Sequence, residues 1–160
     1  MRTTTDILKL ISAILISQLA GVIGSAFTFR AIPTWYATLR KPAFSPPNWI
    51  FGPVWTTLYM LMGIAAWLVW RKGFADRSVR IALILFLTQL ALNALWSVIF
   101  FGLRSPMWAF VEIVALWVAI MMTTIYFFKV SRAAGALMIP YIAWVSFAAV
   151  LNLYIARLNR

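Results

Sequence analysis

The chain has 160 residues, of which 64% are hydrophobic and 11% are charged, and its formal net charge is +11. Soluble domains are about half apolar and about a quarter charged, so this composition is typical of a membrane protein. Cysteine and histidine are both absent, which excludes disulfides, thiolate chemistry and the commonest metal and haem ligands. The basic residues gather in loops and tails, where they suit anionic lipid headgroups better than nucleic acid.

Five apolar runs are each long enough to cross a hydrocarbon core of about 30 Å, which takes about 20 helical residues. The predicted spans are 7–29, 50–70, 81–101, 107–128 and 133–155. The first run is longer than an ordinary signal-peptide core, so we keep it as a membrane helix. We therefore expect an all-α membrane protein with one domain over residues 1–160, folded as a bundle of five transmembrane helices.

Local signals mark where these helices begin. Ser105 before Pro106 predicts an N-cap followed by proline at the first helical position, and Ser78 and Ser131 are expected to cap the third and fifth helices. The short connections after the second, third and fourth spans predict antiparallel neighbours. Lysine and arginine are slightly more numerous on the N-terminal side, which favours a cytoplasmic N-terminus in a bacterial cell membrane.

One connection is long, and it lies between the first two spans. Helix signals there run from Pro33 to just before Pro42, so we expect a short helix across the bundle, anchored by Trp35 and Tyr36. The next stretch, 41–55, reads KPAFSPPNWIFGPVW and combines four prolines with two tryptophans. Long ordered loops are often functional lids, and this one is too aromatic for a linker.

Polar and aromatic side chains inside membrane spans need a partner or a cavity. Three spans carry such residues at helical spacing. The stripes are Trp55 and Tyr59 in the second span, Gln89, Asn93, Trp96 and Ser97 in the third, and Tyr141, Trp144, Ala148 and Asn152 in the fifth. A shared ligand cavity is one interpretation, and amides that only link neighbouring helices are the other. The residue pattern alone favours neither of these two interpretations over the other.

Two further features lie inside the spans. Glu112 is the only acidic residue there, and we expect it to reach the interface or to pair with Arg104, with a proton relay as the minority alternative. Gly21, Gly24 and Ser25 form a small-residue ridge that is suited to close helix packing, within or between subunits.

The end of the chain matches the loose sterol-recognition pattern of membrane proteins. The matching residues are Val150, Leu151, Tyr154 and Arg157. Such matches are weak, so we favour the simpler interpretation of a Tyr–Arg anchor at the membrane interface.

Three stretches resemble the translocator protein family, also known as the TspO or peripheral benzodiazepine receptor family. They read KPAFSPPNWIFGPVWTTLYMLMG, QLALNALWSVIFFG and IPYIAWVSFAAVLN, and they occur in the family's order. Phe44 stands where the family usually has tryptophan. The resemblance implies a five-helix bundle, usually a homodimer, that binds tetrapyrroles such as protoporphyrin IX, hydrophobic drug-like molecules and, in animal members, cholesterol.

The family's pocket positions overlap the three stripes, so the cavity interpretation becomes the preferred one. The predicted ligand-binding residues are Trp35, Tyr36 and Pro46 in the loop region, Phe51, Trp55 and Tyr59 in the second span, Gln89, Asn93 and Trp96 in the third, and Trp144 and Ala148 in the fifth. We expect a porphyrin to stack on Trp and Tyr rings, with Arg40 and Lys41 beside its propionates. No metal site or additional cofactor is required.

A tetrapyrrole receptor or carrier is the function that we prefer from the sequence. The first alternative is light- and oxygen-dependent porphyrin degradation, with Trp55 and Trp144 as the candidate residues. The second is a sterol- or lipid-handling membrane protein. Acid–base catalysis is hard to build here, because histidine is absent and Glu112 is the only acid within a span.

Overall fold

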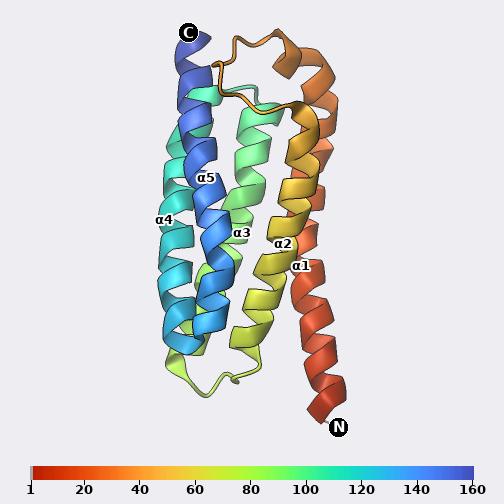
Figure 1. Ribbon diagram of the computed structural model, residues 1–160, viewed down its shortest axis with the longest axis vertical. Helices are drawn as coiled ribbons and strands as arrows, with labels where there is room; N and C mark the ends of the chain where they lie inside the picture. Colours follow the sequence, from red (N-terminus) through yellow and green to blue (C-terminus); the bar gives the residue numbers. More distant parts are fainter. Residues whose placement is uncertain (1) are drawn as a thin grey trace.

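The computed structural model describes residues 2–160, and these form a bundle of five long helices without β-strands (Figure 1). The helices are α1 (Arg2–Ala31), α2 (Asn48–Trp70), α3 (Arg77–Ser97), α4 (Pro106–Val130) and α5 (Arg132–Leu158), and two π-helical turns, η1 (Ile32–Tyr36) and η2 (Val98–Gly102), extend α1 and α3. All five are long and apolar enough to cross a membrane. The predicted spans are therefore confirmed, each inside one continuous helical segment.

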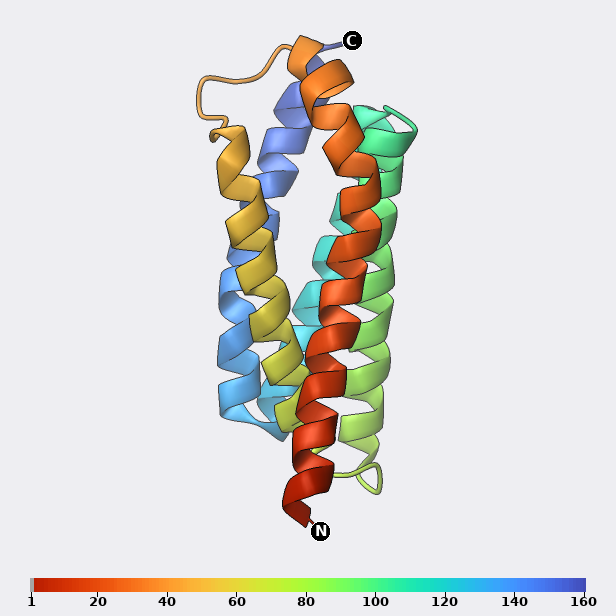
Figure 2. The same ribbon diagram turned by 90° about the vertical axis from the view of Figure 1, so that its right-hand side faces the viewer.

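The helices form a closed ring in the order α1, α2, α5, α4 and α3, because each packs along its two neighbours in that order. α3 lies mainly between α1 and α4 and contacts α2 less extensively, although a short loop joins α2 to α3. The chain ends lie at opposite ends of the bundle (Figure 1, Figure 2), as five successive spans require.

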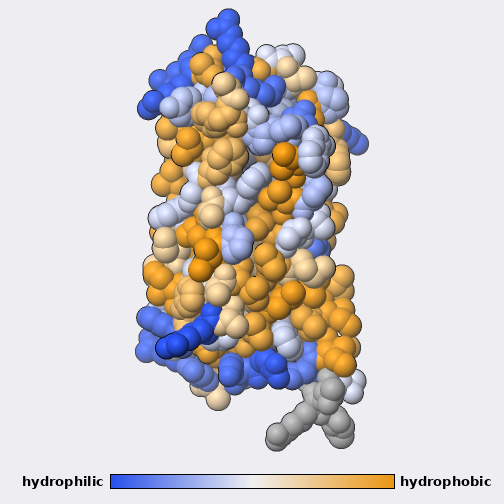
Figure 3. All heavy atoms as spheres, in the orientation of Figure 1, coloured by the Kyte–Doolittle hydropathy of each residue, from blue (hydrophilic) through white to orange (hydrophobic). Residues whose placement is uncertain are grey.

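The face of the bundle in Figure 3 is mostly apolar along its middle and hydrophilic at both ends. Leu15, Ile84 and Val111 are 63%, 64% and 54% exposed on the outer surface of the bundle, whereas Gln89 and Asn93 are buried inside. This distribution suits a molecule surrounded by lipid, because lipid covers apolar side chains and cannot satisfy polar ones.

The half of the bundle nearest the N-terminus is filled by side chains. Met62 and Met138 are fully buried there, and the rings of Phe86 and Phe127 stack at 5.7 Å. Gly63 allows α2 to approach α1 closely, since a Cβ atom at this position would lie 2.6 Å from Ile14 Cα. The other half of the bundle contains the cavity described below.

The helix expected to begin near Pro33 is present at those residues, but it continues α1 and is not a separate element. The chain stays helical through η1 and as far as Thr38. Proline lacks the N–H that an α-helical hydrogen bond requires, and a π-helical turn accommodates the missing bond without ending the helix. Residues 39–47 then form an irregular loop that reaches α2 (Figure 2).

The predicted helix caps are partly confirmed. Ser131 Oγ accepts an N–H of the first turn of α5 at 3.4 Å, and Ser105 precedes Pro106 at the start of α4 but makes no side-chain capping bond. The prediction for α3 is wrong. Its cap is Asp76, whose carboxylate accepts the Ser78 N–H at 2.7 Å, because the helix begins before Ser78.

Candidate functional site

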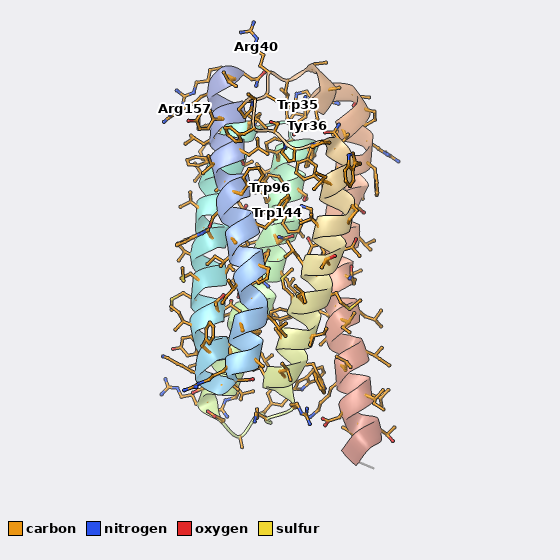
Figure 4. The ribbon with its side chains drawn as sticks, in the orientation of Figure 1. Trp35, Tyr36, Arg40, Trp96, Trp144 and Arg157 are labelled. Atoms are coloured by element: carbon orange, nitrogen blue, oxygen red, sulfur yellow. The ribbon has the colours of Figure 1, made fainter. Side chains whose placement is uncertain are left out.

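A cavity of about 490 Å³ lies between α1, α2, α3 and α5, in the half of the bundle near the loop 39–47. Most of the predicted ligand-binding residues line it, namely Tyr36, Phe51, Trp55, Tyr59, Asn93, Trp96, Trp144 and Ala148. Figure 4 shows Trp96 and Trp144 within the bundle, below Trp35 and Tyr36. Side chains from distant parts of the chain therefore meet around one apolar space.

Aromatic rings form much of the wall. Trp55 stacks on Tyr59 at 5.6 Å, one turn along α2, and meets Tyr141 of α5 edge-on at 6.3 Å. Phe51 and Trp144 link α2 to α5 in the same way at 6.1 Å. These tilted contacts fix each ring through its neighbours, so the cavity presents ring faces and edges whose positions are set before any ligand enters.

A chain of hydrogen bonds closes the bottom of the cavity. The Tyr59 hydroxyl donates to Asn93 Oδ1, Asn93 Nδ2 donates to the Tyr141 hydroxyl at 3.0 Å, and that hydroxyl donates to Gln89 Oε1 at 2.8 Å. All four residues are buried. Polar side chains in a low-dielectric interior need such partners, and here they also connect α2, α3 and α5.

Two tryptophans of the cavity wall differ in whether their N–H group has a hydrogen-bond partner. Trp96 Nε1 donates to Asn152 Oδ1 at 3.0 Å, and Asn152 Nδ2 donates to the Pro106 carbonyl at 2.7 Å. Trp144 Nε1 is buried and has no hydrogen-bond partner in the described part of the chain. A buried donor without a partner is costly, and the Trp144 residue that carries it is one of those lining the cavity.

The cavity reaches the outer surface between α1 and α2. Its lining includes Val22 and Phe29 of α1 and Trp49 of α2, which are 62%, 76% and 73% exposed. Further along the same seam, Gln18 Nε2 donates to the Thr56 carbonyl at 3.1 Å and holds the two helices together. The opening therefore lies on the side of the bundle that faces lipid.

Three predicted binding residues lie outside the cavity lining. Gln89 lies beneath it, bonded to Tyr141, and Trp35 packs edge-on against Phe100 at 5.7 Å. Pro46 is half-buried in the loop that leads to α2. These residues support the wall or its rim, so a direct contact between any of them and a ligand stays a prediction.

Sequence reasoning missed the contribution of α1 to the site. Gly21, Gly24 and Ser25 line the cavity. A Cβ atom at Gly21 would lie 2.5 Å from the Tyr59 ring, and one at Gly24 would lie 2.9 Å from Ser97 Oγ. The small-residue ridge therefore packs inside the subunit, against α2 and α3, and the homodimer stays a prediction. The ridge itself was the available signal, but nothing in its pattern indicates a cavity.

The residues of the sterol-recognition pattern do not share one face. Leu151 is buried and lines the main cavity, whereas Val150 and Tyr154 are 49% and 46% exposed. The Tyr154 ring meets Phe44 edge-on at 5.3 Å, and Arg157 projects at the end of α5 (Figure 4). Phe44, in place of the tryptophan usual in the family, thus still provides an aromatic contact between the loop and α5.

Glu112 is 8% exposed, and neither carboxylate oxygen has a hydrogen-bond partner among the described residues. The predictions that it reaches the interface or pairs with Arg104 are wrong. The physical reason is its position on α4, where it turns inward on the same side of the helix as Ala109 and Leu116. A role as a proton relay stays a prediction.

Comparison with known proteins places the chain in a family. The model of the TspO/MBR family matches residues 13–158. The chain is 46% identical over 155 residues to the tryptophan-rich protein TspO of Archaeoglobus fulgidus, which covers 96% of this chain and 99% of the relative. It is 42% identical over 144 residues to the human translocator protein, which covers 89% and 85% of the two chains.

A third relative is the tryptophan-rich sensory protein of Cereibacter sphaeroides, 37% identical over 125 residues that cover 78% of this chain and 77% of the relative. The matched residues include every residue that lines the cavity. The chain therefore belongs to the TspO/MBR family, and its five apolar helices make it an integral, multi-pass membrane protein.

Proposed function

We propose that this protein binds a tetrapyrrole such as protoporphyrin IX in the cavity between α1, α2, α3 and α5, and acts as a receptor or carrier in the membrane. The observation that carries the proposal is the aromatic wall around a space of about 490 Å³. Small-molecule sites have volumes of about 300–1,000 Å³ and mostly apolar walls with a few polar groups. Hydrophobic drug-like molecules suit the same space.

The chemistry of the wall favours a flat aromatic ligand that carries a hydrogen-bond acceptor. Trp55 and Trp144 present large π-surfaces for stacking from two different helices. The polar atoms of Tyr59 and Asn93 are already bonded to each other, whereas the Trp144 N–H lacks a partner in the described chain. An imine-type ring nitrogen or a carboxylate oxygen of the ligand would satisfy that N–H if a small rotation of the Trp144 ring turned it toward the cavity.

The surroundings of the cavity supply an entrance and positive charge. The gap between α1 and α2 opens toward lipid, the phase in which an apolar porphyrin dissolves. Lys41 Nζ lies 4.5 Å from the centre of the Tyr36 ring, and Tyr36 lines the cavity. Lys41, with Arg40 beside it in the chain, is therefore well placed to meet propionate groups.

The names of the relatives favour a receptor or carrier. One is called a sensory protein, and several animal relatives are called translocator proteins. These names describe those proteins, and they support the corresponding proposal for this chain without identifying a ligand.

Binding in lipid nanodiscs tests the proposal. Trp55→Leu and Trp144→Leu should each weaken protoporphyrin IX binding by about two- to tenfold or more, since stacking on one aromatic ring contributes about 0.5–1.5 kcal/mol beyond the buried area and about 1.4 kcal/mol corresponds to about tenfold. Trp108→Leu is the matched control, because Trp108 is 69% exposed on α4 and lies outside the cavity lining. Porphyrin absorbance gives the affinity. Unchanged affinity in both cavity variants would overturn the assignment.

The alternatives are separated by repeating the titration in the dark and in the light, and with a sterol. Loss of porphyrin absorbance that requires light, oxygen and intact Trp144 would favour degradation over carriage. Sterol binding that survives Trp55→Leu and Trp144→Leu would indicate a separate lipid-handling surface.

A further inference from the structure

A second hollow, of about 400 Å³, lies between the end of α1 and the turn that connects η2 to α4. Its lining includes two arginines, Arg30 and Arg104, together with Phe27, Phe101 and Gly102. A Cβ atom at Gly102 would lie 2.9 Å from the Phe27 ring, so the two segments meet closely at this point. The hollow is separate from the opening between α1 and α2, although Phe101 contributes to both cavities.

The two arginines of this hollow carry uncompensated positive charge. The chain has three acidic residues in all. Asp6 pairs with Arg71 and Asp76 caps α3, both at the opposite end of the bundle, and Glu112 is buried in α4. Neither guanidinium has an ion-pair or hydrogen-bond partner in the part of the chain that the structure describes.

The backbone at Arg104 is also unusual. Its φ angle is +52°, and it is the only residue other than glycine with a positive φ among residues 2–160. Glycine or asparagine would adopt this left-handed conformation more readily than arginine. Strained positions of this kind often serve a site, and here the strained residue belongs to the lining of the hollow.

An apolar stripe continues from the hollow along the outer surface of α1. Phe27, Ile23 and Leu19 follow Arg30 toward the middle of the bundle at helical spacing. Their exposed fractions are 38%, 46% and 56%. The stripe faces outward, where lipid chains lie. The two arginines of the hollow are therefore followed along α1 by an apolar surface.

We propose that this hollow binds the phosphate headgroup of an anionic glycerophospholipid. The Arg30 and Arg104 guanidinium groups would hold the phosphate oxygens, because arginine's planar set of donors matches phosphate geometry. An acyl chain would follow the stripe of Phe27, Ile23 and Leu19. The apolar stripe and the position at the end of the spans favour a lipid over a free phosphate ion.

Native mass spectrometry of the purified protein in an uncharged detergent tests this assignment. Phosphatidylglycerol and phosphatidylcholine with identical acyl chains are titrated against the parent and two double variants. The double variant Arg30→Gln with Arg104→Gln should lower the affinity for the first phosphatidylglycerol molecule by about tenfold or more. Arg157→Gln with Arg160→Gln removes the same charge from the same end of the bundle, outside the hollow, and should change that affinity by less than about twofold.

Two further measurements separate the effect of the arginine donors from that of charge, and a lipid from a free phosphate ion. Arg30→Lys with Arg104→Lys retains the charge but not the forked donors, and should weaken binding about threefold or more; this pair decides the question if the glutamine pair does not fold. Millimolar inorganic phosphate should not displace the lipid. Equal binding of both lipids, equal losses in the two glutamine pairs, or displacement by phosphate would each overturn the proposal.

Discussion

The backbone of Arg40 is joined to the side chain of Asn159 by two hydrogen bonds, although the two residues lie 119 positions apart in the sequence. The Arg40 N–H donates to Asn159 Oδ1 at 2.9 Å, and Asn159 Nδ2 donates to the Arg40 carbonyl at 2.9 Å. Asn159 Nδ2 also donates to the carbonyl of Ile155, which lines the cavity. The loop 39–47 is thereby held to the end of α5, beside the cavity wall.

Asn159→Ala should release this loop without disturbing the bundle. An exposed pair of hydrogen bonds contributes about 1 kcal/mol, so opening of the loop should become about fivefold more frequent. Amide hydrogen exchange across residues 40–45 should rise by that factor, and porphyrin should dissociate faster. Arg160→Ala, at the next position, is the control and should leave exchange unchanged. Equal exchange in the parent and Asn159→Ala would show that the two bonds do not hold the loop.

Asn93→Ala should destabilise the protein, because it removes the link between the Tyr59 and Tyr141 hydroxyls. Buried groups that lose a partner cost about 1–3 kcal/mol, and hydrogen bonds between membrane helices fall toward the lower end of such values. We expect a lower Tm by a few degrees. Thr88→Ala, on the exposed side of α3, loses only a bond to Ile84 within its own helix and should unfold like the parent.

Two glycines of α2 should respond oppositely to alanine. Gly63→Ala forces a Cβ atom to within 2.6 Å of Ile14 Cα, so α1 must move away and the free energy of unfolding should fall by about 1–3 kcal/mol. Gly52→Ala meets no atom within 4 Å and should be neutral or stabilising by up to about 1 kcal/mol, since alanine favours helix. Thermal unfolding in one detergent measures both. Equal Tm values would contradict the close approach of α1 and α2.

The five helices could be predicted from the sequence, whereas the way they pack against one another could not. A hydrocarbon core requires long apolar runs whose backbone groups are hydrogen-bonded within the helix, so the spans were predictable without knowledge of their packing. The neighbour that each helix face contacts could not be predicted in this way. Gly21 reads as a packing residue, but the periodicity of α1 contains no information that Tyr59 of α2 and a cavity lie opposite it.

The candidate site was predictable only where several signals agreed. Trp55, Trp96 and Trp144 are deep aromatics on three helices and all line the cavity. Gln89 has the same helical spacing as Asn93, yet it faces Tyr141 below the cavity, because one turn along α3 separates the open half of the bundle from the packed half. Spacing along a helix indicates a face and does not indicate the depth at which the packing ends.

Ala148→Leu should lower porphyrin affinity more than Ala115→Leu does. Ala148 lines the cavity one turn beyond Trp144, so a leucine would fill space that the ligand needs or overpack α5 against its neighbours, at a cost of about 1–3 kcal/mol. Ala115 is exposed on α4 and lies outside the lining. Affinity and Tm of both variants are compared in the same detergent. If Ala115→Leu alone impaired binding, the assigned face of α5 would be wrong.

Free-base protoporphyrin IX and its iron complex should bind with affinities that differ by less than about tenfold, or about 1.4 kcal/mol. The chain contains neither histidine nor cysteine, the usual strong axial ligands of haem iron, so recognition should depend on the macrocycle. Parallel absorbance titrations give the comparison. A low-spin iron spectrum on binding, or a much larger preference for the iron complex, would show that another side chain ligates the metal.

An experimental structure of the protein with protoporphyrin IX bound would show directly whether the tetrapyrrole lies inside the bundle. We expect the macrocycle to stack among Trp55, Trp96 and Trp144, within the cavity that these residues line. A porphyrin on the outer surface of the helices, with the cavity unoccupied, would show that the binding site lies elsewhere.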